Sequence, residues 1–432
     1  MQKTSSSPFD YFSYYKQVLT CEGVSLKTIA EKVGTPTYVY SAGSFLNSYR
    51  KLDQGLSGLS HQICFAMKSN SNLSILRLLA SQGSGLDVVS GGELYRAQKA
   101  GVAGERIVFS GVGKTVQEMR EGLSYGGKGI FSFNVESLPE LTTLNQVASQ
   151  MKTKARVALR FNPDVDPKTH PYISTGIKKN KFGMNRKEIL EVLKNLDRFP
   201  AIEIKGISIH IGSQLLSLSP LADAFDRLAS LVDFSSEKFG LNLEFLDLGG
   251  GLGISYGPEK SVPVSKYCEL IQKKFGKKSK YQGRFKIVLE PGRQIAGNSG
   301  VLLTQVLYRK ERKSQDFLIV DGGMNDLIRP ALYSSHHEIV PVQQELLKGP
   351  KKKARVVGPV CESSDFFAKD RPLPLRLKEG DLLAVLSAGA YGFSMAGQYN
   401  SRPLVAEVLV QDGKFEVIRT RNSYTDLIQG EV

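Results

Sequence analysis

The feature that most restricts the fold of this chain is an alternation of short apolar runs with helical patterns, which begins near residue 36. The runs are almost continuous in hydrophobic residues, as strands buried on both faces of a parallel sheet are. The segments between them, such as 136–148 and 221–239, carry apolar residues three and four positions apart, which is typical of helices. About eight such units over roughly 250 residues predict a closed (β/α)8 barrel. The runs are Thr37–Tyr40, Ile63–Met67, Leu86–Val89, Ile107–Phe109, Gly129–Phe133, Val157–Phe161, Ile204–Ile211, Phe245–Leu248 and Phe285–Leu289.

The pattern changes after residue 292 to strands separated by turns, with little helix, which is typical of an antiparallel β domain. The first 35 residues precede the alternation, and we expect them to join this second domain. The length of 432 residues suits two domains. We therefore predict a barrel over residues 36–290 and a β domain formed by residues 1–35 and 291–432. The expected later strands are Val301–Tyr308, Asp316–Val320, Ala354–Val357, Leu382–Leu386 and Leu404–Gln411.

The net charge of +15 raises the question of a nucleic-acid partner. Proteins that grip phosphate backbones concentrate Lys and Arg on one face or arm. In this sequence the basic residues are scattered, and the two local runs, 273–280 and 351–355, are typical of solvated faces. We therefore expect no nucleic-acid partner.

The four cysteines are widely spaced and form neither a disulfide framework nor a zinc-site pattern. The cluster His336-His337-Glu338 has no standard metal-ligand spacing, so we expect a loop there and no metal site. The N-terminus lacks the apolar region of a secretion signal, and no apolar stretch reaches 18 residues. These features predict a cytoplasmic protein without a membrane span.

Residues with chemical potential follow several of the predicted strands, where the catalytic groups of a (β/α)8 barrel lie. Lys68 follows the run Ile63–Met67, and a lysine there is a candidate for forming a Schiff base. Its structural alternative is a side chain that extends into solvent. His210 lies within the run Ile204–Ile211, after Ile209, and its flat ring could stack on a cofactor or be a hydrogen-bonded core histidine.

Two further strand ends carry groups suited to a phosphate and to a heterocycle. The turn Gly249-Gly250-Gly251 offers backbone amides to a phosphate, although Ile254 departs from the dinucleotide-binding pattern. The segment Glu290-Pro291-Gly292-Arg293 offers a carboxylate for a ring nitrogen and a guanidinium for an anion. An exposed ion pair is the structural alternative for this segment.

The ordered set of motifs resembles that of the diaminopimelate decarboxylases, which are pyridoxal-phosphate enzymes of the alanine-racemase-like, barrel-plus-β-domain class. The resemblance covers nearly the whole chain. Four motifs are shared with ornithine and arginine decarboxylases: Phe65-Ala66-Met67-Lys68-Ser69-Asn70, His210-Ile211-Gly212-Ser213-Gln214, Gly249-Gly250-Gly251 and Glu290-Pro291-Gly292-Arg293. Three motifs are typical of the diaminopimelate branch: Arg329-Pro330-Ala331-Leu332-Tyr333, Cys361-Glu362-Ser363-Ser364-Asp365 and Tyr399-Asn400-Ser401-Arg402-Pro403. The segment Gly389-Ala390-Tyr391-Gly392 also belongs to the resemblance.

The resemblance implies roles for the barrel residues toward pyridoxal phosphate. Lys68 is expected to hold the cofactor as a Schiff base, and His210 to stack on its ring. Glu290 is expected to keep the ring nitrogen protonated, because a nearby negative charge raises the pKa of that nitrogen. The phosphate is expected to bind Ser213, Gly250, Gly251 and the backbone of Gly292 and Arg293.

The resemblance also implies how the substrate binds. Arg293, Arg329 and Tyr333 resemble a clamp for the distal carboxylate, a task suited to guanidinium groups. Glu362 is expected to bind the distal ammonium group, and Cys361 to return a proton as general acid. Tyr391 is expected to face cofactor and substrate. In the family Cys361, Glu362 and Tyr391 reach the cofactor from the partner subunit, which implies a homodimer.

The predicted function is decarboxylation of meso-2,6-diaminopimelate to L-lysine, the last step of lysine biosynthesis by that route. One alternative is a decarboxylase of a related basic amino acid, such as D-lysine, D-ornithine or a polyamine precursor. Such a substrate lacks the distal carboxylate, so activity would not depend on Arg329. Another alternative is a regulatory protein that carries the cofactor without turnover, but such relatives generally lack the β domain. A nucleic-acid binder would be recognised by salt-dependent retention on DNA.

Overall fold

The computed structural model describes residues 11–166, 181–313 and 315–432. The chain divides into two compact units. The barrel unit contains residues 48–254 and 260–294, and the β unit contains residues up to 47, 255–259 and 295–432. Residues 1–10 of the N-terminal segment that the sequence assigns to the β domain lie outside the described residues.

Within the described residues, eight strands close into a barrel, in the order β10-β11-β12-β5-β6-β7-β8-β9. All neighbouring strands are parallel, which confirms the predicted (β/α)8 architecture. Most positions in these strands are buried, since side chains fill the inside and helices cover the outside. The strands are β5 (His61–Ala66), β6 (Gly85–Val88), β7 (Ile107–Phe109), β8 (Ser132–Val135), β9 (Ala155–Phe161), β10 (Ile202–Ile209), β11 (Phe245–Asp247) and β12 (Lys286–Leu289).

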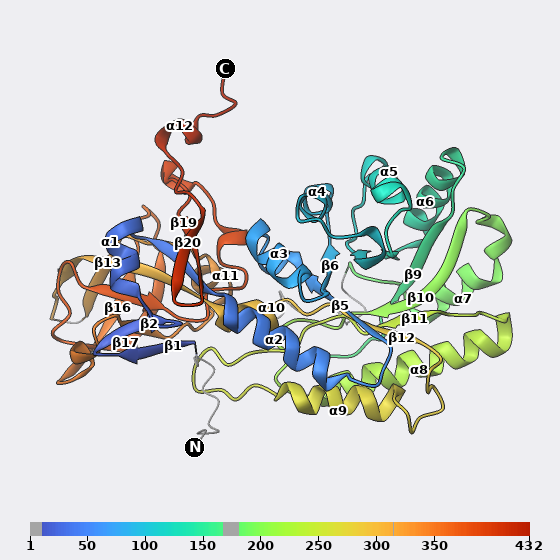
Figure 1. The fold of residues 1–432 in the computed structure, drawn as a ribbon, viewed down its shortest axis with the longest axis horizontal. Coiled ribbons are helices and arrows are strands. Elements are labelled where there is room, and N and C mark those ends of the chain that lie inside the picture. The colour runs from blue at the N-terminus through green and yellow to red at the C-terminus, as the bar shows by residue number, and fades with distance from the viewer. Residues whose placement is uncertain (1–10, 167–180, 314) are drawn as a thin grey trace. The chain divides into compact units, whose positions relative to one another are not determined.

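The helices of the barrel unit lie on the outside of the strands (Figure 1). Their starts are set by local side chains: Thr115 and Glu118 form a reciprocal capping box at α5, and Asn185 and Glu188 form one at α7. In the described part of the chain, no helix is both long and apolar enough to cross a bilayer. The helices are α2 (Ala42–Gly55), which begins in the β unit, α3 (Leu73–Ala80), α4 (Gly91–Lys99), α5 (Val116–Ser124), α6 (Leu138–Gln150), α7 (Arg186–Lys194), α8 (Ser219–Phe239), α9 (Val264–Phe275) and α10 (Arg293–Ala296).

The first apolar run, Thr37–Tyr40, is not a barrel strand, so its prediction as part of the alternating barrel pattern was wrong. It forms β4 (Thr37–Ser41), which pairs antiparallel with β13 and parallel with β19 in the β unit. All five residues are buried, because the strand has neighbours on both edges and is covered on both faces. Val39 belongs to an apolar cluster with Leu26 and Ile29. A central strand of this kind has the same continuous apolar pattern as a barrel strand.

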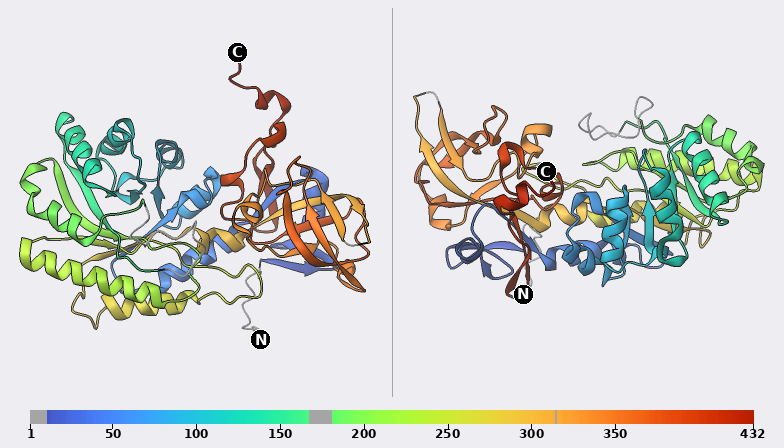
Figure 2. Two further views of the ribbon diagram at one scale, coloured as in Figure 1. Left: turned by 180° about the vertical axis from the view of Figure 1, so that it is seen from behind. Right: turned by 90° about the horizontal axis from the view of Figure 1, so that it is seen from above.

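The β unit is built on a curved sheet, seen from two further directions in Figure 2, in the order β17-β16-β14-β13-β4-β19-β20. β18 pairs with β13 and β15. Most pairs are antiparallel as predicted, but β4 with β19 and β14 with β16 are parallel. The elements are β1 (Phe12–Tyr15), β2 (Val18–Cys21), β3 (Val24–Ser25), α1 (Leu26–Val33), β13 (Gly300–Lys310), β14 (Asp316–Val320), α11 (Arg329–Tyr333), β15 (Ile339–Pro341), β16 (Lys351–Val357), β17 (Phe366–Pro374), β18 (Leu382–Val385), β19 (Ala406–Gln411), β20 (Lys414–Arg419) and α12 (Tyr424–Leu427).

Candidate active site

Lys68 lies in a single 3-10 turn, Met67–Ser69, directly after β5 at the C-terminal end of the barrel. The five residues before it are buried, whereas its own side chain is 37% exposed. Its Nζ donates a hydrogen bond of 3.3 Å to Oδ2 of Asp87, a fully buried carboxylate on β6. The amine therefore stands at the barrel end beside a compensating negative charge.

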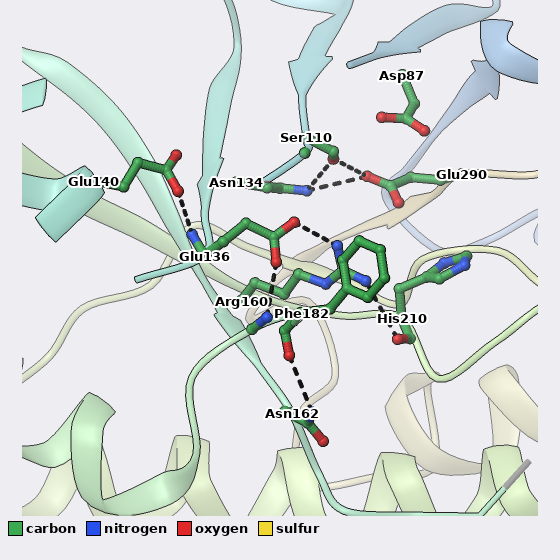
Figure 3. A network of polar contacts seen from close by, with 12 residues as sticks. Asp87, Ser110, Asn134, Glu136, Glu140, Arg160, Asn162, Phe182, His210 and Glu290 are labelled. Carbon is green, nitrogen blue, oxygen red and sulfur yellow. Dashed lines mark hydrogen bonds and ion pairs between the residues drawn. The ribbon is translucent and has the colours of Figure 1, made fainter. Parts of the chain in front are cut away.

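Glu290 follows β12 and belongs to a buried polar cluster at the same barrel end. Its Oε1 accepts hydrogen bonds from Ser110 Oγ at 3.2 Å and from Asn134 Nδ2 at 3.0 Å (Figure 3). The Asn134 amide also donates to Oδ2 of Asp247 at 2.9 Å. Burial, followed by the charges of Asp247 and Asp87, holds the pKa of Glu290 well above its usual range. Burial raises the pKa of Asp247 to about 6. Crowded, desolvated carboxylates of this kind favour a cationic group beside them.

The sequence predictions did not assign roles to Asp87 and Asp247. The signal that could have found them is a charged residue inside an apolar run, as in Leu86-Asp87-Val88 and Leu246-Asp247-Leu248. A carboxylate in a strand buried on both faces requires partners inside the barrel.

His210 follows β10, and its Nδ1 accepts a hydrogen bond of 3.1 Å from the backbone N–H of Gly250. Burial and the nearby positive charges of Lys68 and Arg160 keep the pKa of His210 well below its usual range. The ring is therefore neutral at physiological pH. A flat neutral ring held by a backbone amide is suited to stacking against an aromatic group.

The glycine turn after β11 approaches two other strand ends so closely that side chains are excluded. A Cβ on Gly250 would lie 2.1 Å from the carbonyl oxygen of Glu290, and one on Gly251 would lie 2.2 Å from that of Gly212. Gly251 also has a φ of 101°, which disfavours other residues. The turn therefore presents bare backbone, the surface that a phosphate group requires.

Arg293, Ser213 and Gly292 gather beside this turn and beside Lys68. The guanidinium of Arg293 donates from Nε and Nη2 to Ser213 Oγ, at 3.3 and 3.0 Å. A Cβ on Gly292 would lie 3.1 Å from the Ser69 side chain, which places the Gly292 backbone against the turn that holds Lys68. The structure thus brings all eight barrel candidates to the C-terminal strand ends: Lys68, His210, Ser213, Gly250, Gly251, Glu290, Gly292 and Arg293.

A second buried network, not predicted from the sequence, supports His210 (Figure 3). Arg160 Nη1 pairs with Glu136 Oε1 at 2.5 Å, and its Nη2 donates to the carbonyl oxygen of His210 at 3.5 Å. The other oxygen of Glu136 accepts from the backbone N–H of Gly183 at 2.8 Å. Because both members of the ion pair are buried and hydrogen-bonded, they hold the backbone around His210 in place.

Arg329 and Tyr333 begin and end the short helix α11 of the β unit, so their side chains point to similar sides one turn apart. Arg329 is buried and donates to Ser335 Oγ at 3.3 Å. Its Nη1 lies 3.0 Å from Nε2 of His337, and its guanidinium carbon lies 4.5 Å from the centre of the Tyr256 ring. His337 belongs to the predicted loop before β15, but it is fully buried.

Cys361 and Glu362 are exposed in the loop after β16. The backbone N–H of Cys361 donates to Asn400 Oδ1 at 2.7 Å, and the Tyr399 hydroxyl lies 3.5 Å from Glu362 Oε2. Two motifs that lie nearly 40 residues apart in the sequence therefore form one structure. Asp365 completes the loop by accepting the backbone N–H of Val360 at 2.6 Å.

Tyr391 lies in the turn after β18 and has a φ of 56°, which is uncommon for a tyrosine. The flanking glycines explain how this conformation is maintained. A Cβ on Gly389 would lie 2.1 Å from the carbonyl oxygen of Ala296, and one on Gly392 would lie 2.5 Å from that of Ala388. The half-buried tyrosine is therefore fixed by close packing of the backbone on both sides of it.

Comparisons with known proteins identify close relatives over nearly the full length. A family model described as the pyridoxal-dependent decarboxylase, pyridoxal binding domain, matches residues 43–297. A diaminopimelate decarboxylase of Pseudomonas aeruginosa is 47% identical over 423 residues, covering 98% of this chain and 99% of the relative. One of Aquifex aeolicus is 45% identical over 419 residues, covering 97% of both. The crystal structure of diaminopimelate decarboxylase from Helicobacter pylori complexed with L-lysine is 43% identical with a TM-score of 0.87, covering 93% of this chain and 98% of that one.

Proposed function

This chain belongs to the diaminopimelate decarboxylases, within the pyridoxal-dependent decarboxylase family, and we propose that it converts meso-2,6-diaminopimelate to L-lysine and carbon dioxide. The reaction is the last step of lysine biosynthesis by this route. The observation that carries the proposal is the grouping of Lys68, His210 and the buried Glu290 around a bare glycine turn at the C-terminal end of a barrel.

The barrel residues fit pyridoxal phosphate. When bound, this cofactor accepts the electron pair that remains on the substrate carbon after carbon dioxide leaves. Lys68 is the residue that would attach it, and the bare backbone of Gly250 and Gly251 suits its phosphate, together with Ser213 and the Gly292–Arg293 backbone. The neutral ring of His210 suits the face of the pyridine.

Glu290 is suited to hold a proton on the pyridine nitrogen. Burial, followed by the charges of two other acids, raises the pKa of its carboxylate, and a cationic nitrogen beside it would relieve that crowding. Asn134 and Ser110 both donate to one oxygen, Oε1, and so orient the group. Charge stabilisation by a fixed, buried group of this kind is a large contributor to catalysis.

The candidates of the β unit suit recognition of the rest of the substrate and return of a proton. Arg293 of the barrel, with Arg329 and Tyr333, is proposed to bind the distal carboxylate, and Glu362 the distal ammonium group. The carbon that has lost carbon dioxide must gain a proton, and we assign that step to the Cys361 thiol as general acid. Tyr391 is proposed to contact both cofactor and substrate.

We propose that the active form is a homodimer in which Cys361, Glu362 and Tyr391 complete the site of the other subunit. The exposure of Cys361 and Glu362 in their own unit supports this arrangement. On this proposal the β domain, residues 1–35 and 291–432, completes the barrel of residues 36–290 across the dimer. The compartment is proposed to be the cytoplasm, because all four cysteines are free thiols.

The test is an absorbance spectrum of the purified holoenzyme, recorded before and after adding meso-diaminopimelate, with evolved carbon dioxide measured in parallel. We expect a band from the lysine-bound cofactor that shifts on adding substrate, together with gas release. Lys68→Ala is expected to lose the band and the activity. Gas release from D-lysine that exceeds release from meso-diaminopimelate would identify a related basic amino acid as the substrate.

A further inference from the structure

We propose that His337 is a positioning residue, which holds the guanidinium of Arg329 as a neutral hydrogen-bond acceptor and so strengthens selection for substrates with a distal carboxylate. The inference rests on the proposed role of Arg329 in binding that carboxylate. It concerns a buried histidine that the sequence predictions placed in a loop without a role.

Two hydrogen-bond contacts of the His337 ring indicate which nitrogen carries its proton. Nδ1 lies 2.8 Å from the carbonyl oxygen of Leu386, which can only accept, so the hydrogen is on Nδ1. Nη1 of Arg329 lies 3.0 Å from Nε2 and can only donate. Nε2 must therefore present its lone pair, which requires the neutral ring. A protonated ring would point an N–H at the N–H of a cation.

The ring is anchored to a strand ladder. The backbone N–H of Leu386 donates to the carbonyl oxygen of Glu338 at 2.8 Å, and Ile339 pairs with Val385 in the β15–β18 ladder. His337 is fully buried, so water cannot replace it as an acceptor for Arg329. The Tyr256 ring packs against both groups, with its centre 5.1 Å from that of the His337 ring and 4.5 Å from the guanidinium carbon.

The neutrality of the acceptor matters for binding. A carboxylate at this position would hold the guanidinium equally well, but it would cancel the charge that attracts the substrate carboxylate. An imidazole ring fixes the orientation of Arg329 without contributing a negative charge. Preorganising a charged hydrogen-bond donor in this way reduces the ordering cost when a ligand binds.

The experiment compares two inhibitors that differ only by the carboxylate, L-lysine and cadaverine, in the holoenzyme. We expect His337→Leu to raise the inhibition constant of L-lysine about tenfold and to leave that of cadaverine within about twofold. The KM for meso-diaminopimelate is expected to rise in parallel with the inhibition constant of L-lysine, while kcat changes less. His337→Gln, which retains an acceptor and a donor, is expected to restore part of the loss and carries the test if the leucine variant does not fold.

The neighbouring histidine provides a matched control. His336 pairs with Glu338 at 2.8 Å and with Arg371, so His336→Gln is expected to change neither inhibition constant. Arg329→Ala separates the inference from the function on which it rests. If that variant binds L-lysine normally, both are overturned. If Arg329→Ala weakens the binding of L-lysine while neither His337 variant does, only the role of His337 is overturned. The same conclusion follows if the His337 variants weaken the binding of both inhibitors equally.

Discussion

Asp326 is a buried carboxylate in the segment that leads into α11, and its environment favours the protonated form. Its Oδ2 accepts the backbone N–H of Gly323 at 2.9 Å, which orders the turn before Arg329. Burial raises the pKa of Asp326 from 3.8 to about 7. A single acid of this kind makes part of the stability of the protein depend on pH.

We predict that Asp326→Asn, which resembles the protonated acid, removes this dependence. Because the folded pKa lies above the unfolded one, the folded state binds more protons between pH 3.8 and about 7. The stability that Asp326 contributes is therefore full below pH 3.8 and is lost as pH rises toward 7. Relative to the variant, the free energy of unfolding of the wild type should fall by roughly 2 to 4 kcal/mol over this pH range.

The measurement is the thermal midpoint of wild type and variant from pH 4.5 to 7.5. Asp197→Asn, at an exposed carboxylate of the barrel unit, controls for the loss of one negative charge. A difference between wild type and Asp326→Asn that stays constant across this pH range would rule out the assigned ionisation.

Single residues at strand ends could be predicted from the sequence because their position in the chain already places them. Lys68 and Glu290 each follow an apolar run, and both occur at the barrel end. Asp87 and His337 could not be assigned in this way. The partner of Asp87 is 19 residues away, and that of the His337 Nδ1 atom is 49 residues away. Local pattern shows that a residue is unusual, but only the folded chain shows what it contacts.

At the scale of elements, the turn after β11 depends on the absence of side chains. We predict that Gly250→Ala weakens cofactor binding by about tenfold to a hundredfold, since its Cβ would lie 2.1 Å from the Glu290 carbonyl and must displace β11 or β12. Titration of the apoenzyme with pyridoxal phosphate, followed by absorbance, measures the effect. Gly113→Ala is the control, because nothing lies within 4 Å of its added Cβ and its φ is ordinary. Equal affinity in the two variants would contradict the role of the turn.

The elements also show where the periodicity of a sequence becomes ambiguous. In the described residues each of the eight barrel strands is followed by a helix, so the repeat itself identified the architecture. β4 carries the same apolar run and is followed by a helix, yet it lies at the centre of the other unit's sheet. Burial on both faces produces the same apolar pattern in a barrel strand and in a central strand of the β unit. Only the pairing of β4 with β13 and β19 distinguishes it from a barrel strand.

At the scale of the whole molecule, the proposed homodimer makes each active site depend on two chains. Lys68 belongs to the barrel unit and Cys361 to the β unit. If Cys361 serves the other subunit, a heterodimer of Lys68→Ala and Cys361→Ala subunits has one site with both changes and one site with neither. We therefore predict that mixing equal amounts of these two inactive variants, under conditions of subunit exchange, restores about a quarter of wild-type activity.

The control mixes two variants of the barrel unit, Lys68→Ala and His210→Ala. Each site of that heterodimer carries one damaged barrel, so no recovery is expected whichever subunit supplies Cys361. Recovery in the first mixture and not in the second would show that the site is shared. If the first mixture stays inactive although exchange is verified with differently tagged subunits, Cys361 acts within its own chain.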